Sequence, residues 1–79
     1  MKLKEAVAKR IKEIMNEKVI TQYQLFKCCG VPQSTISKIL NSETKTVKLS
    51  SIYDICSGLN IELSDFFDCN YLKLKNLDD

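Results

Sequence analysis

Apolar residues recur along the start of the chain with the period of an α-helix. The steps between them are four, four and three residues, and lysine and glutamate are prominent among the residues between Leu3, Val7, Ile11 and Ile14. This spacing gathers the apolar side chains on one helical face and leaves the charged ones on the other. We therefore predict an amphipathic helix from Leu3 to about Asn16.

The residues after Ile20 carry the signature of a second helix start. Thr21 can accept a hydrogen bond from the backbone N–H of Gln24, and the Gln24 side chain can reach back to Thr21. This pair forms a capping box, and Ile20 with Leu25 adds a hydrophobic staple. Gly30 can take the left-handed conformation that closes a helix. We predict a helix that starts at Thr21 and runs to about the residue before Gly30.

A third helix is predicted after a turn of about three residues. Pro32 suits the opening turn of a helix, where its missing N–H costs nothing. The apolar positions of this helix are Ile36, Ile39 and Leu40, and its other residues are small or polar. The prediction is a helix of about residues 32–40 whose outward face is rich in hydrogen-bonding groups.

Two more helices are predicted in the second half of the chain. Residues 41–47 show no apolar period, which predicts a loop. Apolar residues return at helical spacing over residues 49–59, where Gly58 and Asn60 are stop signals. Residues 63–67 can form a short fifth helix. The predicted fold class is therefore all-α, a bundle of about five helices.

The tail at residues 69–79 has an ambiguous pattern. Part of it alternates apolar and charged residues like a strand, whereas Tyr71, Leu74 and Leu77 keep helical spacing. We separate this tail from a domain at residues 1–68 and treat it as a candidate dimerisation segment. The candidate contacts between protomers are Phe66, Phe67, Tyr71, Leu74 and Leu77. The two phenylalanines could equally complete the hydrophobic core.

Composition restricts the classes of function. With 79 residues, 44% of them hydrophobic and 28% charged, the chain is one small globular domain. It has no histidine, so the commonest general base and the commonest metal ligand are both absent. A domain this small also has little core from which to form a deep pocket. We expect no enzyme activity, no cofactor and no metal.

Cellular location and cysteine chemistry are linked. No apolar run approaches the roughly 18 residues of a membrane span, and no secretion signal follows the basic start, so we expect a cytoplasmic protein. Its four cysteines should then be reduced, and there is no C-x-x-C pair to suggest zinc. Cys56 falls on an apolar stripe and is expected in the core. Exposure of Cys28 or Cys69 would leave redox control open.

Charge is distributed unevenly along the chain. The net charge is +2, but the first 45 residues hold nine basic and four acidic residues, and the remainder hold three basic and six acidic ones. The first part is the candidate surface for an anionic partner. An alternative interpretation is that these lysines only keep the helix surfaces solvated. Charge alone does not distinguish the two interpretations.

Two short helices joined by a glycine-containing turn form a helix-turn-helix, which can enter the major groove of DNA. The residues that would hold this frame together are Leu25, Gly30, Ile36 and Ile39. The residues that would form the outward face are Gln33, Ser34, Ser37 and Lys38. Amide, hydroxyl and ammonium groups are the ones that pair with base edges and phosphates.

The stretch at residues 21–41 resembles the Cro and phage-repressor-like helix-turn-helix family, also called the XRE family. The resemblance extends over about residues 11–67, through the patterns Leu-x-x-Ile-x-x-Ile-Cys and Leu-x-Ile-x-Leu-x-Asp-Phe-Phe. It implies a five-helix lambda-repressor-like bundle, with the helix-turn-helix in its second and third helices. It also implies a sequence-specific DNA-binding transcriptional regulator, expected to be a repressor. The implied partners are double-stranded DNA with an inverted-repeat operator and a second copy of the chain.

The resemblance also implies site residues. Gln22 matches a position that braces the phosphate backbone, Gln33 and Ser34 match positions that meet base edges, and Lys38 matches a base- or phosphate-facing position. The full set is Thr21, Gln22, Gln33, Ser34, Thr35, Ser37, Lys38, Asn41 and Lys45. Three further residues could touch phosphates or simply cover helix surfaces: Lys9, Arg10 and Tyr23.

The sequence departs from the family pattern at several positions. Phe26 stands where the family usually has alanine, so the corner must open slightly or the ring must swing aside. Ser42 replaces a frequent glycine after the third helix. These departures affect the geometry of the loop. A second class of function also stays open, in which the fold serves as a protein-interaction module, such as an antitoxin-like or antirepressor partner, through its apolar tail.

Overall fold

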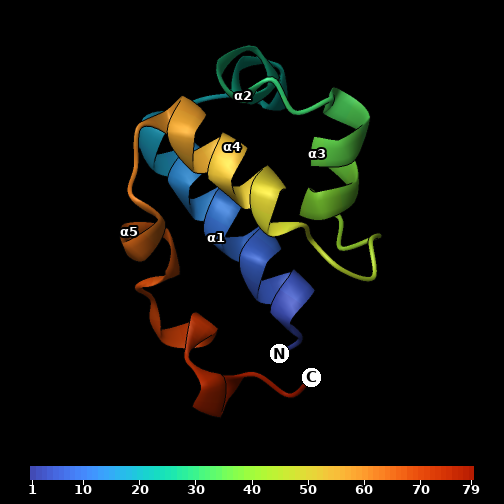
Figure 1. The fold of residues 1–79 in the computed structure, drawn as a ribbon, viewed down its shortest axis with the longest axis vertical. Helices are drawn as coiled ribbons and strands as arrows, with labels where there is room; N and C mark the ends of the chain where they lie inside the picture. The colour runs from blue at the N-terminus through green and yellow to red at the C-terminus, as the bar shows by residue number, and fades with distance from the viewer.

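The computed structural model describes all 79 residues as helices joined by turns, without a strand. The five α-helices are α1 (Leu3–Lys18), α2 (Gln22–Cys29), α3 (Gln33–Leu40), α4 (Leu49–Leu59) and α5 (Leu63–Phe67) (Figure 1). All five predicted helices are confirmed. Three boundaries differ. The helix α1 continues two residues past Asn16. The helices α2 and α3 each begin one residue later than predicted, because Thr21, with ψ 169°, and Pro32, with ψ 143°, are extended and serve as N-caps.

The start of α2 confirms the predicted capping box. Thr21 Oγ1 accepts a hydrogen bond from the backbone N–H of Gln24 at 3.1 Å, and the backbone N–H of Thr21 donates to Gln24 Oε1 at 2.8 Å. Leu25 is fully buried, and Ile20 packs against the same core. These contacts fix the direction in which the chain enters α2.

All four longer helices close with a left-handed residue. Gly30, with φ 76°, ends α2 as predicted, and its N–H donates to the carbonyl of Phe26 at 2.9 Å. After α1, α3 and α4 the left-handed residues are Val19, Ser42 and Asn60, with φ between 54° and 57°. In each of these three cases the next N–H donates to the carbonyl five residues back, which satisfies an otherwise unpaired helix end. Glycine therefore marks only one of the four helix ends.

The core draws on all five α-helices and on the turn before α3. Fourteen buried residues form one hydrophobic cluster, with Phe66 of α5 fully buried in it. Cys56 is confirmed as a core residue, and burial raises the pKa of its thiol. Leu3 and Leu49 were predicted on buried stripes but are 46% and 67% exposed. Each is the first residue of its helix. At that point the apolar side of the helix extends beyond the edge of the core.

The helices α2 and α4 approach closely at Gly58. A Cβ atom at Gly58 would lie 2.7 Å from both the carbonyl oxygen of Cys28 and the Cα of Cys29. The sequence suggested Gly58 as a stop signal, but it lies inside α4, which ends at Asn60. Its function is to let the backbone at the end of α2 touch α4.

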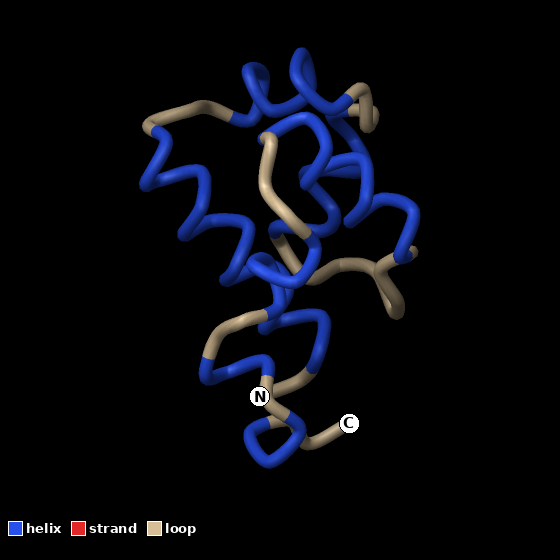
Figure 2. Tube along the Cα trace, turned by 60° about the vertical axis from the view of Figure 1, so that its left-hand side comes forward, coloured by secondary structure: helices blue, strands red, loops and turns tan.

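The tail forms two short 3₁₀ turns, η1 (Asn70–Leu72) and η2 (Leu74–Asn76), so neither the strand nor the α-helix pattern is correct. Tyr71 of η1 lies against α1, where its hydroxyl donates to Glu13 and Lys9 Nζ stands 4.5 Å from the ring centroid. Burial and the Glu13 bond raise the pKa of the Tyr71 hydroxyl, which therefore stays protonated. The two ends of the chain lie near each other (Figures 1 and 2).

Arg10 connects α1 to the end of α5. Its Nε donates to the carbonyl of Phe66 at 2.7 Å and its Nη2 to that of Asp65 at 2.8 Å, while Nη1 stands 3.5 Å from Glu13 Oε1. The sequence left Arg10 open between a phosphate contact and a surface position. In the structure its guanidinium instead caps α5 and holds Phe66 in the core.

Replacing Gly58 with alanine will lower the free energy of unfolding. The added methyl group meets backbone atoms, which cannot rotate away, and such overpacking costs about 1–3 kcal/mol even though alanine favours a helix. Urea denaturation measures the change. Ser57→Ala, an exposed substitution in the same turn, is the matched control. A Gly58→Ala protein as stable as this control would show that α2 and α4 do not cross this closely.

Replacing Arg10 with alanine will lower the free energy of unfolding by about 1.5–3 kcal/mol, because two charge-assisted hydrogen bonds are lost. Lys12→Ala, an exposed change on the same helix, should stay within about 0.5 kcal/mol of wild type. Thermal unfolding of the two variants gives the comparison. Equal stability would mean that Arg10 does not anchor α5.

Candidate nucleic-acid interface

The position of α3 is set by the turn that precedes it. Gly30 reverses the chain, Val31 is buried at 5% exposure, and Pro32 starts the helix. The inward side of α3 then inserts three buried residues into the core: Ile36, Ile39 and Leu40. The opposite side of α3 is consequently fixed toward solvent.

The outward side of α3 carries the polar residues that the sequence predicted. Gln33, Ser34 and Lys38 are exposed, and Thr35 and Ser37 are half-buried. Gln33 and Ser37 are four residues apart, as are Ser34 and Lys38, so the side chains form two neighbouring rows along the helix. No acidic side chain lies within α3. The structure thus gathers five of the nine predicted site residues on one short helix.

Two more predicted residues lie at the start of α2. Gln22 is the first residue of α2 and its side chain is exposed. Thr21 is also exposed, and its oxygen accepts the Gln24 N–H, which leaves its own O–H free to donate. Phe26 is half-buried against the core, and its ring centroid lies 6.1 Å from that of Tyr23. The larger side chain is therefore accommodated at the edge of α2.

The last two predicted residues lie in the loop after α3. Asn41 Nδ2 donates to Ser37 Oγ at 3.4 Å, which ties the start of the loop to the helix, and Lys45 is exposed. Ser42 has the left-handed φ of 56°, which explains physically why a glycine suits this position. The loop is otherwise held by a bond from the Glu43 N–H to the Lys38 carbonyl at 2.9 Å.

A groove of about 370 Å³ runs between the turn, α3, the loop and α4. It contains hydroxyl and charged groups that the sequence did not single out: Thr44, Thr46, Lys48, Ser51 and Asp54. Thr44 Oγ1 is buried there without a hydrogen-bond partner. The first three lie in the loop before α4, and the last two share one side of α4. The sequence does not show that this loop folds against α4 beside α3, so it could not assign these residues to one groove.

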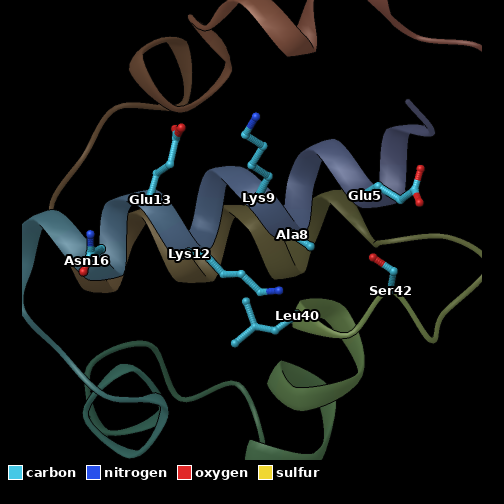
Figure 3. A pocket seen from close by; sticks show the side chains of 8 residues that line it. All are labelled: Glu5, Ala8, Lys9, Lys12, Glu13, Asn16, Leu40 and Ser42. Carbon is cyan, nitrogen blue, oxygen red and sulfur yellow. The ribbon is translucent and has the colours of Figure 1, made fainter.

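A second, open hollow of about 690 Å³ lies on α1 beside the end of α3 (Figure 3). In Figure 3 Lys9 and Glu13 point toward the tail, whereas Lys12 points toward Leu40. Two lysines and two glutamates share this hollow, so it has no dominant charge. No residue from the outward side of α3 lines this hollow. The hollow also has no rows of hydrogen-bonding side chains like those of α3.

Other chemistry has little support in the side-chain arrangement. No group of three or more histidine, cysteine or carboxylate side chains comes together as metal ligands would. Cys28 is exposed, and Cys29 and Cys69 are half-buried, all as free thiols. No helix combines the length and the apolar character that a bilayer crossing requires.

Comparison with known proteins identifies the family to which this geometry belongs. The family model for the Cro/C1-type HTH DNA-binding domain matches residues 10–71, which includes α2, α3, α4 and α5 and most of α1. Neither a curated protein nor a solved structure matches the chain significantly. The matched family binds DNA and is not an enzyme family. The chain belongs to the Cro/C1-type helix-turn-helix DNA-binding family.

Proposed function

We propose that this DNA-binding regulator is a homodimeric repressor that recognises an inverted-repeat operator with α3 in the major groove. The single observation that carries the proposal is the two-sided character of α3. Its inward side is buried in the core, and its outward side presents only polar and cationic groups, of which Ser37 alone has a side-chain hydrogen bond within the fold, to Asn41. An α-helix of this kind fits the major groove, where each base pair has a distinct pattern of donors and acceptors.

The base contacts are assigned to the start of α3. The Gln33 amide can pair with N6 and N7 of adenine, and Ser34 can donate to or accept from a neighbouring base edge. Lys38 lies one turn further on, within reach of a base or a phosphate. Thr35 and Ser37, both half-buried, flank these residues. Together they would supply the sequence preference.

The phosphate contacts are assigned to groups on both sides of α3. The free O–H of Thr21 and the Gln22 amide at the start of α2 would hold one stretch of backbone, and Asn41 and Lys45 in the loop would hold another. Such contacts fix the register of the helix in the groove without reading sequence. Base contacts affect the preference for one DNA sequence, whereas phosphate contacts affect binding to all sequences. Substitutions in the two groups of residues should therefore have different effects on affinity.

Selection from a randomised duplex pool tests the proposal as a whole. A dimer with two recognition helices about 34 Å apart should enrich an inverted repeat with half-sites one helical turn apart. Enrichment of a single unrepeated site would exclude the dimeric form. If nothing is enriched and only the ~10⁻⁴–10⁻⁶ M binding of non-specific contacts is found, the chain would be a protein-interaction module instead.

Gln33→Ala should weaken binding to the selected operator by about 5- to 150-fold, because a bidentate pair with a base contributes ~1–3 kcal/mol. Binding to unrelated DNA should not change. Fluorescence anisotropy with both duplexes measures the ratio of the two affinities. Gln33→Glu should weaken operator binding further, since it removes both amide donors. If the ratio of the two affinities is unchanged in Gln33→Ala, Gln33 is an exposed residue that does not contact a base.

Lys45→Ala should weaken binding to operator and to unrelated DNA by the same factor. It should also lower the slope of log affinity against log salt concentration by about 1, because one phosphate contact is lost. Lys73→Ala, which removes an exposed lysine from the tail, is the charge-matched control and should leave the slope at its wild-type value. If Lys45→Ala and Lys73→Ala give equal slopes of log affinity against log salt concentration, the loop is not part of the DNA interface.

A further inference from the structure

An apolar hollow opens where the start of α1, the start of α4 and the end of α5 meet. Its volume is about 380 Å³, which lies within the ~300–1,000 Å³ range of sites for small ligands. Most of its lining is apolar and comes from these three helices and from the loop before α4. The apolar lining residues are Leu3, Val7, Val47, Leu49, Ile52 and Phe67. A hollow with this lining can take an apolar group out of water.

The hollow extends the core to the surface of the protein. Val7 and Ile52 are buried and belong to the core cluster. Leu3, Leu49 and Phe67, in contrast, are each at least 39% exposed. They stay in contact with water because the hollow between them is open. An apolar ligand that covers them would remove this area from water, which is the main favourable contribution to binding in such sites.

Two lysines at this hollow have no partner for their charge. Lys4 of α1 and Lys45 of the loop both line it, and neither forms an ion pair with a carboxylate of the protein. Lys4 is half-buried, and a partly desolvated cation is attracted to an anion more strongly than an exposed one is. Thr46 adds a hydroxyl that can donate a hydrogen bond. The hollow thus combines an apolar lining with groups that bind an anion.

Asp79 is the acidic residue of this hollow, and its carboxylate is engaged elsewhere. It accepts a hydrogen bond from the backbone N–H of Leu3 at the start of α1. A carboxylate is favoured there, because the first N–H groups of a helix have no partner within the helix. Asp79 forms no ion pair with Lys4 or Lys45. Its charge would repel a second anion in the hollow, so removing that charge should strengthen the binding of an anion.

Phe67 is the one residue of this hollow that the sequence suggested for contacts between protomers. Phe66 was also suggested, but it is fully buried and completes the core, which was the alternative interpretation. Tyr71 is engaged with α1 through Glu13. In the tail, Leu74 is exposed and Leu77 is half-buried, and neither lines the hollow. The five candidates therefore do not form one surface.

We propose that this hollow binds a small carboxylate that carries an apolar chain or ring. The apolar part lies against Leu49 and Phe67. The carboxylate pairs with Lys4 and Lys45. A second copy of the chain fits the hollow less well, because a two-fold axis centred on it would set the same lysines of two copies against each other.

Titration of the free protein with octanoate, followed by NMR spectroscopy of the backbone amides, tests the site without DNA. Octanoate below its micelle concentration should shift the amides of Val7, Val47 and Ile52 until the site is saturated. Octylammonium has the same chain and the opposite charge, and it should bind at least about fivefold more weakly. Equal affinity for the two probes would overturn the proposal. Amide shifts that follow protein concentration and not octanoate would place a second copy in the hollow and would also overturn it.

Two charge variants test where the carboxylate binds. Lys4→Gln should raise the dissociation constant of octanoate roughly fivefold, because an ion pair is lost. Asp79→Asn should lower it, because a like charge is removed. Lys12→Gln, an exposed change on α1 outside the hollow, is the matched control and should bind octanoate like wild type. Equal affinity of Lys4→Gln and Lys12→Gln would overturn the assignment of the carboxylate.

A pair of apolar variants tests where the chain of the ligand lies. Leu49→Ala should weaken octanoate binding at least about threefold, because less apolar area is covered. Tyr53→Ala removes another exposed apolar side chain from α4, one that does not line this hollow, and should bind octanoate like wild type. Both side chains are exposed, so both variants should fold. Equal affinity of the two variants would overturn the position of the apolar part.

Lys45 gives this site a consequence for DNA binding, which rests on the proposed function. That function assigns Lys45 to a phosphate, so a carboxylate bound at Lys45 would compete for the same ammonium group. Octanoate should weaken operator binding of wild type by up to about fivefold, and it should not affect Lys45→Ala. Fluorescence anisotropy with and without octanoate measures both. An equal effect of octanoate on the two proteins would overturn the pairing with Lys45.

The two proposals fail in different ways. If the protein binds octanoate in the hollow but binds no DNA selectively, the proposed function fails and the ligand site stands. If the protein binds its operator but octanoate does not shift the amides of the hollow, the ligand site fails and the proposed function stands.

Discussion

The close approach of α2 and α4 at Gly58 is the constraint on which the rest of the structure depends. Because the backbone of Cys28 and Cys29 rests on Gly58, the end of α2 has a fixed position on α4. Gly30 follows directly and turns the chain, so the start of α3 is fixed as well. The base contacts that we propose for α3 would require this helix to be placed to within about 0.5 Å. In this fold that precision comes from backbone contact, since side chains alone could repack.

The sequence predicted every helix because each has a local cause. The capping box at Thr21 and the glycine at the end of α2 are chemical signals contained within a few residues. The end of α1 has no such signal, and the sequence placed it two residues too early. The chain after α1 turns at Val19, a residue that avoids the left-handed region, and no composition rule points to it. The tail was ambiguous for a related reason, since Tyr71 of its first 3₁₀ turn is held by Glu13 and Lys9, which lie far away in the sequence.

The candidate site was predictable where it lies on a helix and unpredictable where it depends on the loop. Periodicity alone assigns the inward and outward sides of α3, and the structure keeps all its polar residues outward or half-buried. The groove beside α3 brings Thr35 near Ser51 and Asp54 of α4, and no pattern in the sequence links these positions. Charge was an unreliable guide for a similar reason. Arg10 belongs to the basic first half of the chain, but its guanidinium is bound to the carbonyls of α5.

The loop after α3 lies between the helix that carries most of the predicted site residues and α4. It starts at Asn41, which is tied to α3 through Ser37, and it ends at α4, where Lys45 and Val47 line the same hollow as Leu49. Both ends of the loop are therefore fixed by helices. A phosphate contact by Lys45, which we propose, would be made from a segment that is already restricted, and such a contact loses less conformational entropy than one made from a free loop.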